Sequence, residues 1–94
     1  MALDPQFLDF DDIVQIHDAA MAEFGGTQGI KSETLIRSSV DAPENTFFYE
    51  PNSTIFDLAA RYAFSLSRNH GFEDGNKRTA VEVAIIFLDL MDLE

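Results

Sequence analysis

The stretch NHGFEDGNKRTA, residues 69–80, is a polar break between two long apolar segments, and it holds the only adjacent Lys-Arg pair of the chain. Gly71 and Gly75 give the backbone freedom for close turns. Lys77 and Arg78 then begin the most hydrophobic segment, so they stand at the start of a helix. A helix start carries unpaired N–H groups and a partial positive charge, so two cations there cost stability unless an anion binds. The stretch therefore predicts a phosphate site at the beginning of a helix.

Two side chains of the same stretch add chemistry to this predicted site. His70 carries an imidazole, the group best suited near neutral pH to take a proton from a hydroxyl nucleophile. Asp74 would repel phosphate by itself, but with Mg²⁺ between them it becomes a metal ligand. Taken singly, His70 could be a helix C-terminal cap and the segment EDGN an ordinary turn. Taken together, His, Asp, Gly, Asn, Lys and Arg within nine residues favour a phosphotransfer-type site.

The segments around the stretch have helical periodicity, which predicts an all-α fold. The first predicted helix is capped by Asp9 and stopped by Gly25-Gly26, and the second begins at Ser32 and ends before Pro43. The third is capped by Thr54 or Ser53 and ends near Asn69, and the fourth begins at about Lys77. His17 falls on the apolar face of the first. A lone histidine there is more often a satisfied core residue than a ligand.

The segment ENTFFYEPNS, residues 44–53, has aromatic and β-favouring residues between Asn and Pro breakers and shows no helical period. This pattern predicts an exposed loop or a short hairpin. Phe47, Phe48 and Tyr49 are either packed inward or available to a partner. Inward packing is the default expectation, because exposed apolar clusters are uncommon in monomers.

The last predicted helix is apolar on all sides, with only Glu82 and Asp89 interrupting it before its end. A helix of this kind must be buried on every side, and three other helices are too few to cover it. Either the native chain continues past Glu94 or another chain supplies the missing wall. We expect a second copy of the chain or a partner protein to cover this helix.

Composition limits the possible functions. Ninety-four residues suffice for one domain, residues 1–94, with a single core. Seventeen acidic against six basic residues give a formal charge of −11, which disfavours nucleic acid and anionic membranes as partners. No apolar run approaches the roughly 18 residues that span a bilayer. The absence of cysteine and of a signal-peptide pattern fits the cytoplasm.

The segment HGFEDGNKRTA, residues 70–80, resembles the motif of the Fic/Doc superfamily, specifically its Doc (death-on-curing) branch. The segments RSSVDAPENTF and LAARYAFSLSRNH are similar to that branch as well, so the resemblance spans most of residues 7–91. Lys77 replaces the second glycine of the Fic pattern, and Val81 stands where Fic proteins have a second arginine. Doc-type members share both departures. The resemblance implies a compact Fic/Doc-type helical bundle, here without a further C-terminal helix.

The resemblance also implies an activity. Doc-type members transfer the γ-phosphate of ATP to a threonine of elongation factor Tu, as toxins of toxin–antitoxin pairs. Carried over to this chain, His70 is the general base and Asp74 holds Mg²⁺. The residues expected to cradle the phosphates are Gly75, Asn76, Lys77 and Arg78. Phe72 is expected to anchor the loop in the core, and Glu82, one turn after Arg78, could pair with it.

The resemblance further places a target-docking flap within residues 45–52, where strand pairing would align the target segment. The flap residues are Thr46, Phe48, Tyr49 and Glu50. No inhibitory-helix pattern is evident in the sequence, so a separate antitoxin is expected to cover the site and the last helix. An AMP-transferring Fic enzyme is the first alternative. An inactive or truncated Fic-fold interaction module is the second, and a homodimer is the alternative to a foreign partner.

Overall fold

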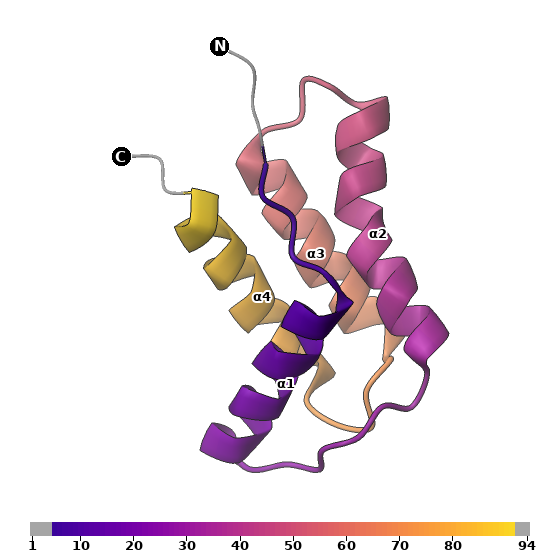
Figure 1. The fold of residues 1–94 in the computed structure, drawn as a ribbon, viewed down its shortest axis with the longest axis vertical. Coiled ribbons are helices and arrows are strands. Elements are labelled where there is room, and N and C mark those ends of the chain that lie inside the picture. The colour runs from indigo at the N-terminus through magenta and orange to yellow at the C-terminus, as the bar shows by residue number, and fades with distance from the viewer. Residues whose placement is uncertain (1–4, 92–94) are drawn as a thin grey trace.

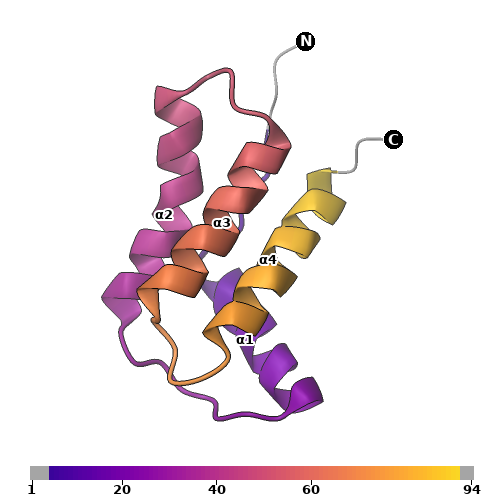
Figure 2. The ribbon, with the colours of Figure 1, turned by 180° about the vertical axis from the view of Figure 1, so that it is seen from behind.

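The computed structural model describes residues 5–91, which form four helices (Figure 1). They are α1 (Phe10–Phe24), α2 (Glu33–Tyr49), α3 (Ile55–Asn69) and α4 (Asn76–Met91). Helix α3 lies between α2 and α4, and α1 crosses one face of this row (Figures 1 and 2). The described residues contain one isolated β-bridge and no strand, so the all-α prediction is confirmed.

Side-chain caps begin three of the helices at the predicted residues. The Asp9 carboxylate accepts a hydrogen bond from Asp12 N at 2.9 Å, and the Asp12 carboxylate accepts one from Asp9 N at 3.0 Å. These two bonds form a capping box. Ser32 caps α2 through Leu35 N at 3.2 Å. Thr54 caps α3 in a second capping box. These contacts are local, which is why the sequence predicted them.

Helix α2 runs through Pro43 to Tyr49, so the prediction that it ends before Pro43 is wrong. Proline removes the N–H that would bond the Ser39 carbonyl, which weakens a helix interior. However, Ile36, Val40 and Pro43 are buried on one face, and Phe47 packs against the same core. Their spacing of four, three and four residues is helical. Burial of this face outweighs the lost hydrogen bond.

The predicted loop or hairpin over residues 44–53 is correspondingly wrong for its first six residues, which are the last turns of α2. Only residues 50–54 connect α2 to α3. Of the three aromatic residues, Phe47 points inward, with its ring centroid 6.1 Å from that of Phe7. Phe48 and Tyr49 are each 77% exposed and meet edge to face at 5.1 Å, so inward packing is wrong for these two.

The core is centred on Tyr62 of α3 and Phe87 of α4, whose ring centroids lie 5.3 Å apart. The Tyr62 hydroxyl donates to Leu8 O at 3.2 Å and accepts from Leu8 N at 2.9 Å. This pair of bonds fastens the segment before α1 across the bundle. Burial of the phenol raises the pKa of Tyr62 to about 12.

Helix α4 buries Thr79, Ala80, Val83 and Phe87 against the other helices. Val81 and Ile85, on the opposite face, stay about half exposed, at 51% and 50%, and Leu90 near the end of the helix is 46% exposed. The other three helices therefore leave part of α4 uncovered, as predicted. The prediction of chain beyond Glu94 lies outside the described residues. Within residues 5–91, none of the helices has the length and apolar character to cross a membrane.

Candidate functional site

The residues predicted to bind phosphate or to carry the chemistry come together in the turn between α3 and α4 and the start of α4, at one end of the bundle (Figures 1 and 2). They line an open hollow of about 410 Å³. Its lining residues are His70, Glu73, Asp74, Gly75, Asn76, Lys77 and Arg78. All six residues predicted to bind phosphate or to carry the chemistry are thus neighbours on one surface.

His70 ends α3 with a left-handed backbone, φ 53° and ψ 49°. A residue without glycine's freedom pays for this conformation, so its neighbours must hold it in place. Its side chain is exposed and makes no hydrogen bond with the described residues. The backbone of His70 therefore ends the helix, while its imidazole keeps both nitrogens for solvent or a ligand.

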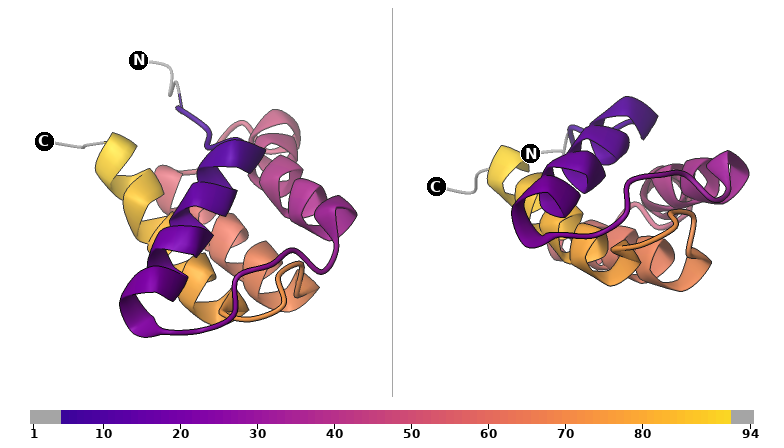
Figure 3. Two further views of the ribbon diagram at one scale, coloured as in Figure 1. Left: turned by 60° about the horizontal axis from the view of Figure 1, so that its bottom comes forward. Right: turned by 90° about the horizontal axis from the view of Figure 1, so that it is seen from below.

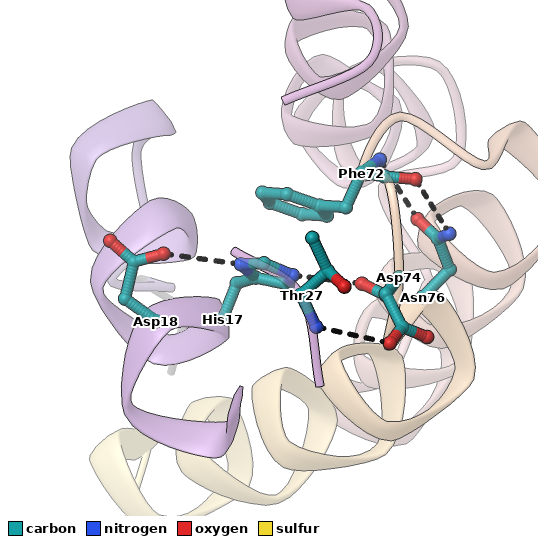
Figure 4. A network of polar contacts seen from close by, with 6 residues as sticks. All are labelled: His17, Asp18, Thr27, Phe72, Asp74 and Asn76. Atoms are coloured by element: carbon teal, nitrogen blue, oxygen red, sulfur yellow. Dashed lines mark hydrogen bonds and ion pairs between the residues drawn. The ribbon is translucent and has the colours of Figure 1, made fainter. Parts of the chain in front are cut away.

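Phe72 anchors the turn in the core, as predicted, and is only 2% exposed. Its ring stacks on the His17 ring at 3.8 Å with an interplanar angle of 4°. The Asn76 side chain closes the turn, because its Oδ1 accepts from Phe72 N and its Nδ2 donates to Phe72 O, both at 3.0 Å (Figure 4). Since both polar atoms of the Asn76 side chain are engaged in these bonds, Asn76 offers its backbone N–H to a ligand.

A second segment, residues 25–32, runs beside this turn (Figure 3). Glu73 N donates to Gly29 O at 3.1 Å, and Gly71 O accepts from the backbone amides of Lys31 and Ser32. An isolated antiparallel bridge joins Ile30 to Phe72. This pairing was not predicted from the sequence. Its signal is the glycine-rich run GGTQG at positions 25–29, which allows the positive φ angles found there.

Asp74 is held by three contacts, of which those with His17 and Thr27 are drawn in Figure 4. Its carboxylate accepts from Thr27 N at 3.1 Å and from Gly75 N at 2.8 Å, and its carbonyl oxygen lies 2.8 Å from His17 Nε2. The carboxylate is exposed and has lone pairs left for a cation. No group of three potential metal-ligating side chains occurs among residues 5–91. One carboxylate suits Mg²⁺, which commonly binds proteins through one or two carboxylates, phosphate oxygens and water.

The start of α4 suits an anion. Of the four described helices, only α4 begins without a side-chain cap, and its first turn contains no acidic residue. Thr79 N makes the first helical bond, to Gly75 O at 2.9 Å, so the amides of Asn76, Lys77 and Arg78 have no helical acceptor. These three amides and two cationic side chains match what phosphate binding requires.

Arg78 lies over the ring of Phe24, at 4.1 Å from the ring centroid. It forms no ion pair with Glu82 within 4.0 Å in the described structure, so the alternative of a local salt bridge is wrong. A cation–π contact with a ring face uses none of the hydrogen bonds that the guanidinium can donate. Phe24 therefore supports Arg78 without consuming its hydrogen-bond donors.

The predicted flap residues are not part of this hollow. Thr46, Phe48, Tyr49 and Glu50 lie where α2 ends, at the opposite end of α3 from the turn (Figure 1). The 15 residues of α3 correspond to about 22 Å. The structure therefore does not bring them together with His70. Backbone pairing beside the turn comes from residues 29–32 instead.

Comparison with known proteins gives a consistent result. Residues 7–88 match the model of the Fic/DOC family. One similar protein is "Protein kinase doc" of Escherichia phage P1, 30% identical over 78 residues, which covers 83% of this chain and 62% of that protein. Another is "Toxin Doc" of Mycolicibacterium smegmatis, 34% identical over 86 residues, which covers 90% and 64%. The chain thus spans less than two thirds of the length of these relatives.

Proposed function

Because the chain belongs to the Fic/DOC family, in its Doc branch, we propose that it is a Doc-like toxin that transfers the γ-phosphate of ATP to a protein hydroxyl. A threonine of a translation factor such as elongation factor Tu is the proposed acceptor. The observation that carries the proposal is the uncapped, cation-bearing start of α4 with His70 and Asp74 in the same hollow.

The proposed roles follow from the chemistry of each group. His70 would take the proton of the acceptor hydroxyl. The hydroxyl oxygen would then form a bond to the γ-phosphorus while the bond between the γ-phosphorus and the oxygen of the leaving ADP breaks. Asp74 would hold Mg²⁺ together with phosphate oxygens, and the ion would supply charge neutralisation on the transferred group. The free amides of α4, with Lys77 and Arg78, would orient the phosphates.

Val81 favours γ-phosphate transfer over AMP transfer. It lies one turn after Arg78, is 51% exposed and carries no charge. A second arginine at this position, as in the Fic pattern, would give the nucleotide another cationic contact. Lys77 adds bulk and charge where that pattern has glycine. AMP transfer is the competing activity, and it predicts a different labelled product.

An antitoxin is the proposed partner. A groove of about 390 Å³ lies between α1 and α4, and its lining combines apolar residues, the half-exposed Leu90 among them, with acidic residues. Its apolar lining includes Ile16, Ala20, Ile86 and Leu90, and its acidic lining includes Glu23 and Glu82. We propose that an antitoxin segment with apolar and basic side chains occupies this groove and restrains the toxin.

Isotope labelling tests the proposal. The protein is incubated with Mg²⁺, a bacterial lysate and ATP that carries the label at either the α or the γ phosphorus. Label from the γ position alone is the expected result, whereas label from the α position would identify an AMP transferase. No transfer from either would support a binding module.

Two variants make the test specific for the site. His70→Ala should lower the transfer rate by at least about 100-fold, because general-base catalysis contributes 10²–10⁴-fold. Glu73→Ala is the matched control, since Glu73 lines the same hollow and has no assigned role. Equal activity of both variants would refute the role of His70.

A further inference from the structure

We infer that His17, on α1, is a positioning residue for the site: its Nε2–H bond to the Asp74 carbonyl sets where the Asp74 carboxylate lies. The part of this inference that concerns metal binding rests on the proposed function and deepens it. The geometric part stands on the contacts of His17 alone. The sequence identified His17 only as a core histidine, and that prediction is confirmed by its complete burial.

The contacts of His17 fix the direction of its hydrogen bond. Its ring is 0% exposed and lies flat against Phe72, and its Nε2 is 2.8 Å from Asp74 O (Figure 4). A carbonyl oxygen only accepts, so Nε2 must carry the hydrogen. The other nitrogen, Nδ1, is 3.2 Å from the carboxylate of the neighbouring Asp18. Only the Nε2 bond joins α1 to the turn that carries the site.

This bond is the connection of Asp74 to a rigid element. The other two donors to Asp74 are the amides of Thr27 and Gly75, which both belong to connecting segments. Helix α1, in contrast, is fixed in the core through Ile13, which is completely buried. The carbonyl and the carboxylate of Asp74 belong to one residue, so holding the first restricts the second. Groups that orient a metal ligand in this way change metal affinity or activity by about 10–100-fold when removed.

A purely structural role makes the opposite prediction from a positioning role. Phenylalanine at position 17 keeps the ring and its stack on Phe72 but has no donor. Glutamine loses the ring but can place an N–H near the same point. If His17 only fills space, His17→Phe should resemble the wild type more closely than His17→Gln. If His17 positions Asp74, His17→Gln should be the better substitute.

The metal-dependent test measures the Mg²⁺ concentration for half-maximal phosphate transfer, and separately the affinity for Mn²⁺ by electron paramagnetic resonance with a non-hydrolysable ATP analogue present. His17→Phe should weaken both by about 10-fold. His17→Gln should stay within about threefold of the wild type, with circular dichroism as the check on folding. A His17→Phe variant that matches the wild type in both measurements would overturn the inference.

The metal-free test needs no activity. Nitrogen-15 NMR of the wild type should find hydrogen on Nε2 of His17, and a bare Nε2 would overturn the inference even if neither variant folds. The amides of Thr27 and Gly75 should exchange with solvent about 10-fold faster in His17→Phe than in His17→Gln. If exchange is faster in His17→Phe than in His17→Gln while the wild type transfers no phosphate, the proposed function fails and the positioning role stands. Faster exchange in His17→Gln refutes the positioning role.

Discussion

Gly75→Ala tests the packing beneath the proposed anion site. Gly75 has φ 73°, in the left-handed region, where a side chain costs about 1–2 kcal/mol. An added Cβ would also lie 2.7 Å from Sδ of Met21 and still nearer to its Cε. Met21 is only 5% exposed, so its side chain has little room to move. Overpacking of this kind costs about 1–3 kcal/mol. We therefore expect Gly75→Ala to lower the free energy of unfolding by about 2–5 kcal/mol.

The two contributions can be separated by urea unfolding, followed by circular dichroism, of four proteins: the wild type, Gly75→Ala, Met21→Val and the double variant. Valine keeps the Cγ position of Met21 and lacks the Sδ and Cε that the new methyl would meet. The double variant should therefore be about 1–2 kcal/mol more stable than the sum of the single losses predicts.

Gly25→Ala is the matched control. Gly25 has φ 83°, and an added Cβ there would meet nothing within 4 Å. This substitution should cost only the backbone term, about 1–2 kcal/mol. Additivity within about 0.5 kcal/mol in the Met21 and Gly75 cycle would refute the predicted clash. A loss for Gly75→Ala no larger than that for Gly25→Ala would refute it as well.

Three further predictions concern the core and the turn. The pKa of Tyr62 rises from 10.0 in the unfolded chain to about 12 in the fold, so the stability that this group contributes should be fully present below pH 10 and be lost, by about 2–3 kcal/mol, towards pH 12. Denaturant titrations across this range check it, and an unchanged pH dependence in Tyr62→Phe would contradict it. Thr79 Oγ1 is buried without a partner among the described residues, so Thr79→Val should raise the free energy of unfolding by up to about 1–2 kcal/mol and raise the melting temperature with it. A lower melting temperature would contradict this and mean that the hydroxyl has a partner. Asn76→Ala removes both bonds to the Phe72 backbone and should cost about 1–3 kcal/mol, with faster exchange of the Phe72 amide; unchanged exchange would contradict this.

Features that depend on neighbouring residues could be predicted from the sequence. Asp9, Ser32 and Thr54 cap helices through bonds to residues three positions later. The gathering of the motif residues is likewise local, because residues 70–78 form one short turn and the first turn of α4. Local geometry brings such residues together whatever the rest of the chain does.

The end of α2 was not predictable in this way. Pro43 and the aromatic run after it are weak helix formers, and local propensity indicated a break. The face formed by Ile36, Val40, Pro43 and Phe47 has somewhere to pack only once α3 and the segment before α1 are in place. Tertiary burial then overrides the local preference, and residues 44–49, predicted as part of a loop or hairpin, become the last turns of α2.

The sequence by itself determined four helical segments, the caps of three of them and a turn equipped with His70, Asp74 and two cations at a helix start, because each is specified within a few residues. Only the tertiary structure decided what surrounds that turn. Residues 29–32 pair with it, and His17 reaches Asp74 across 57 positions of the chain. Contacts at such separation leave no periodic signal in the sequence, since they depend on how the helices pack against one another.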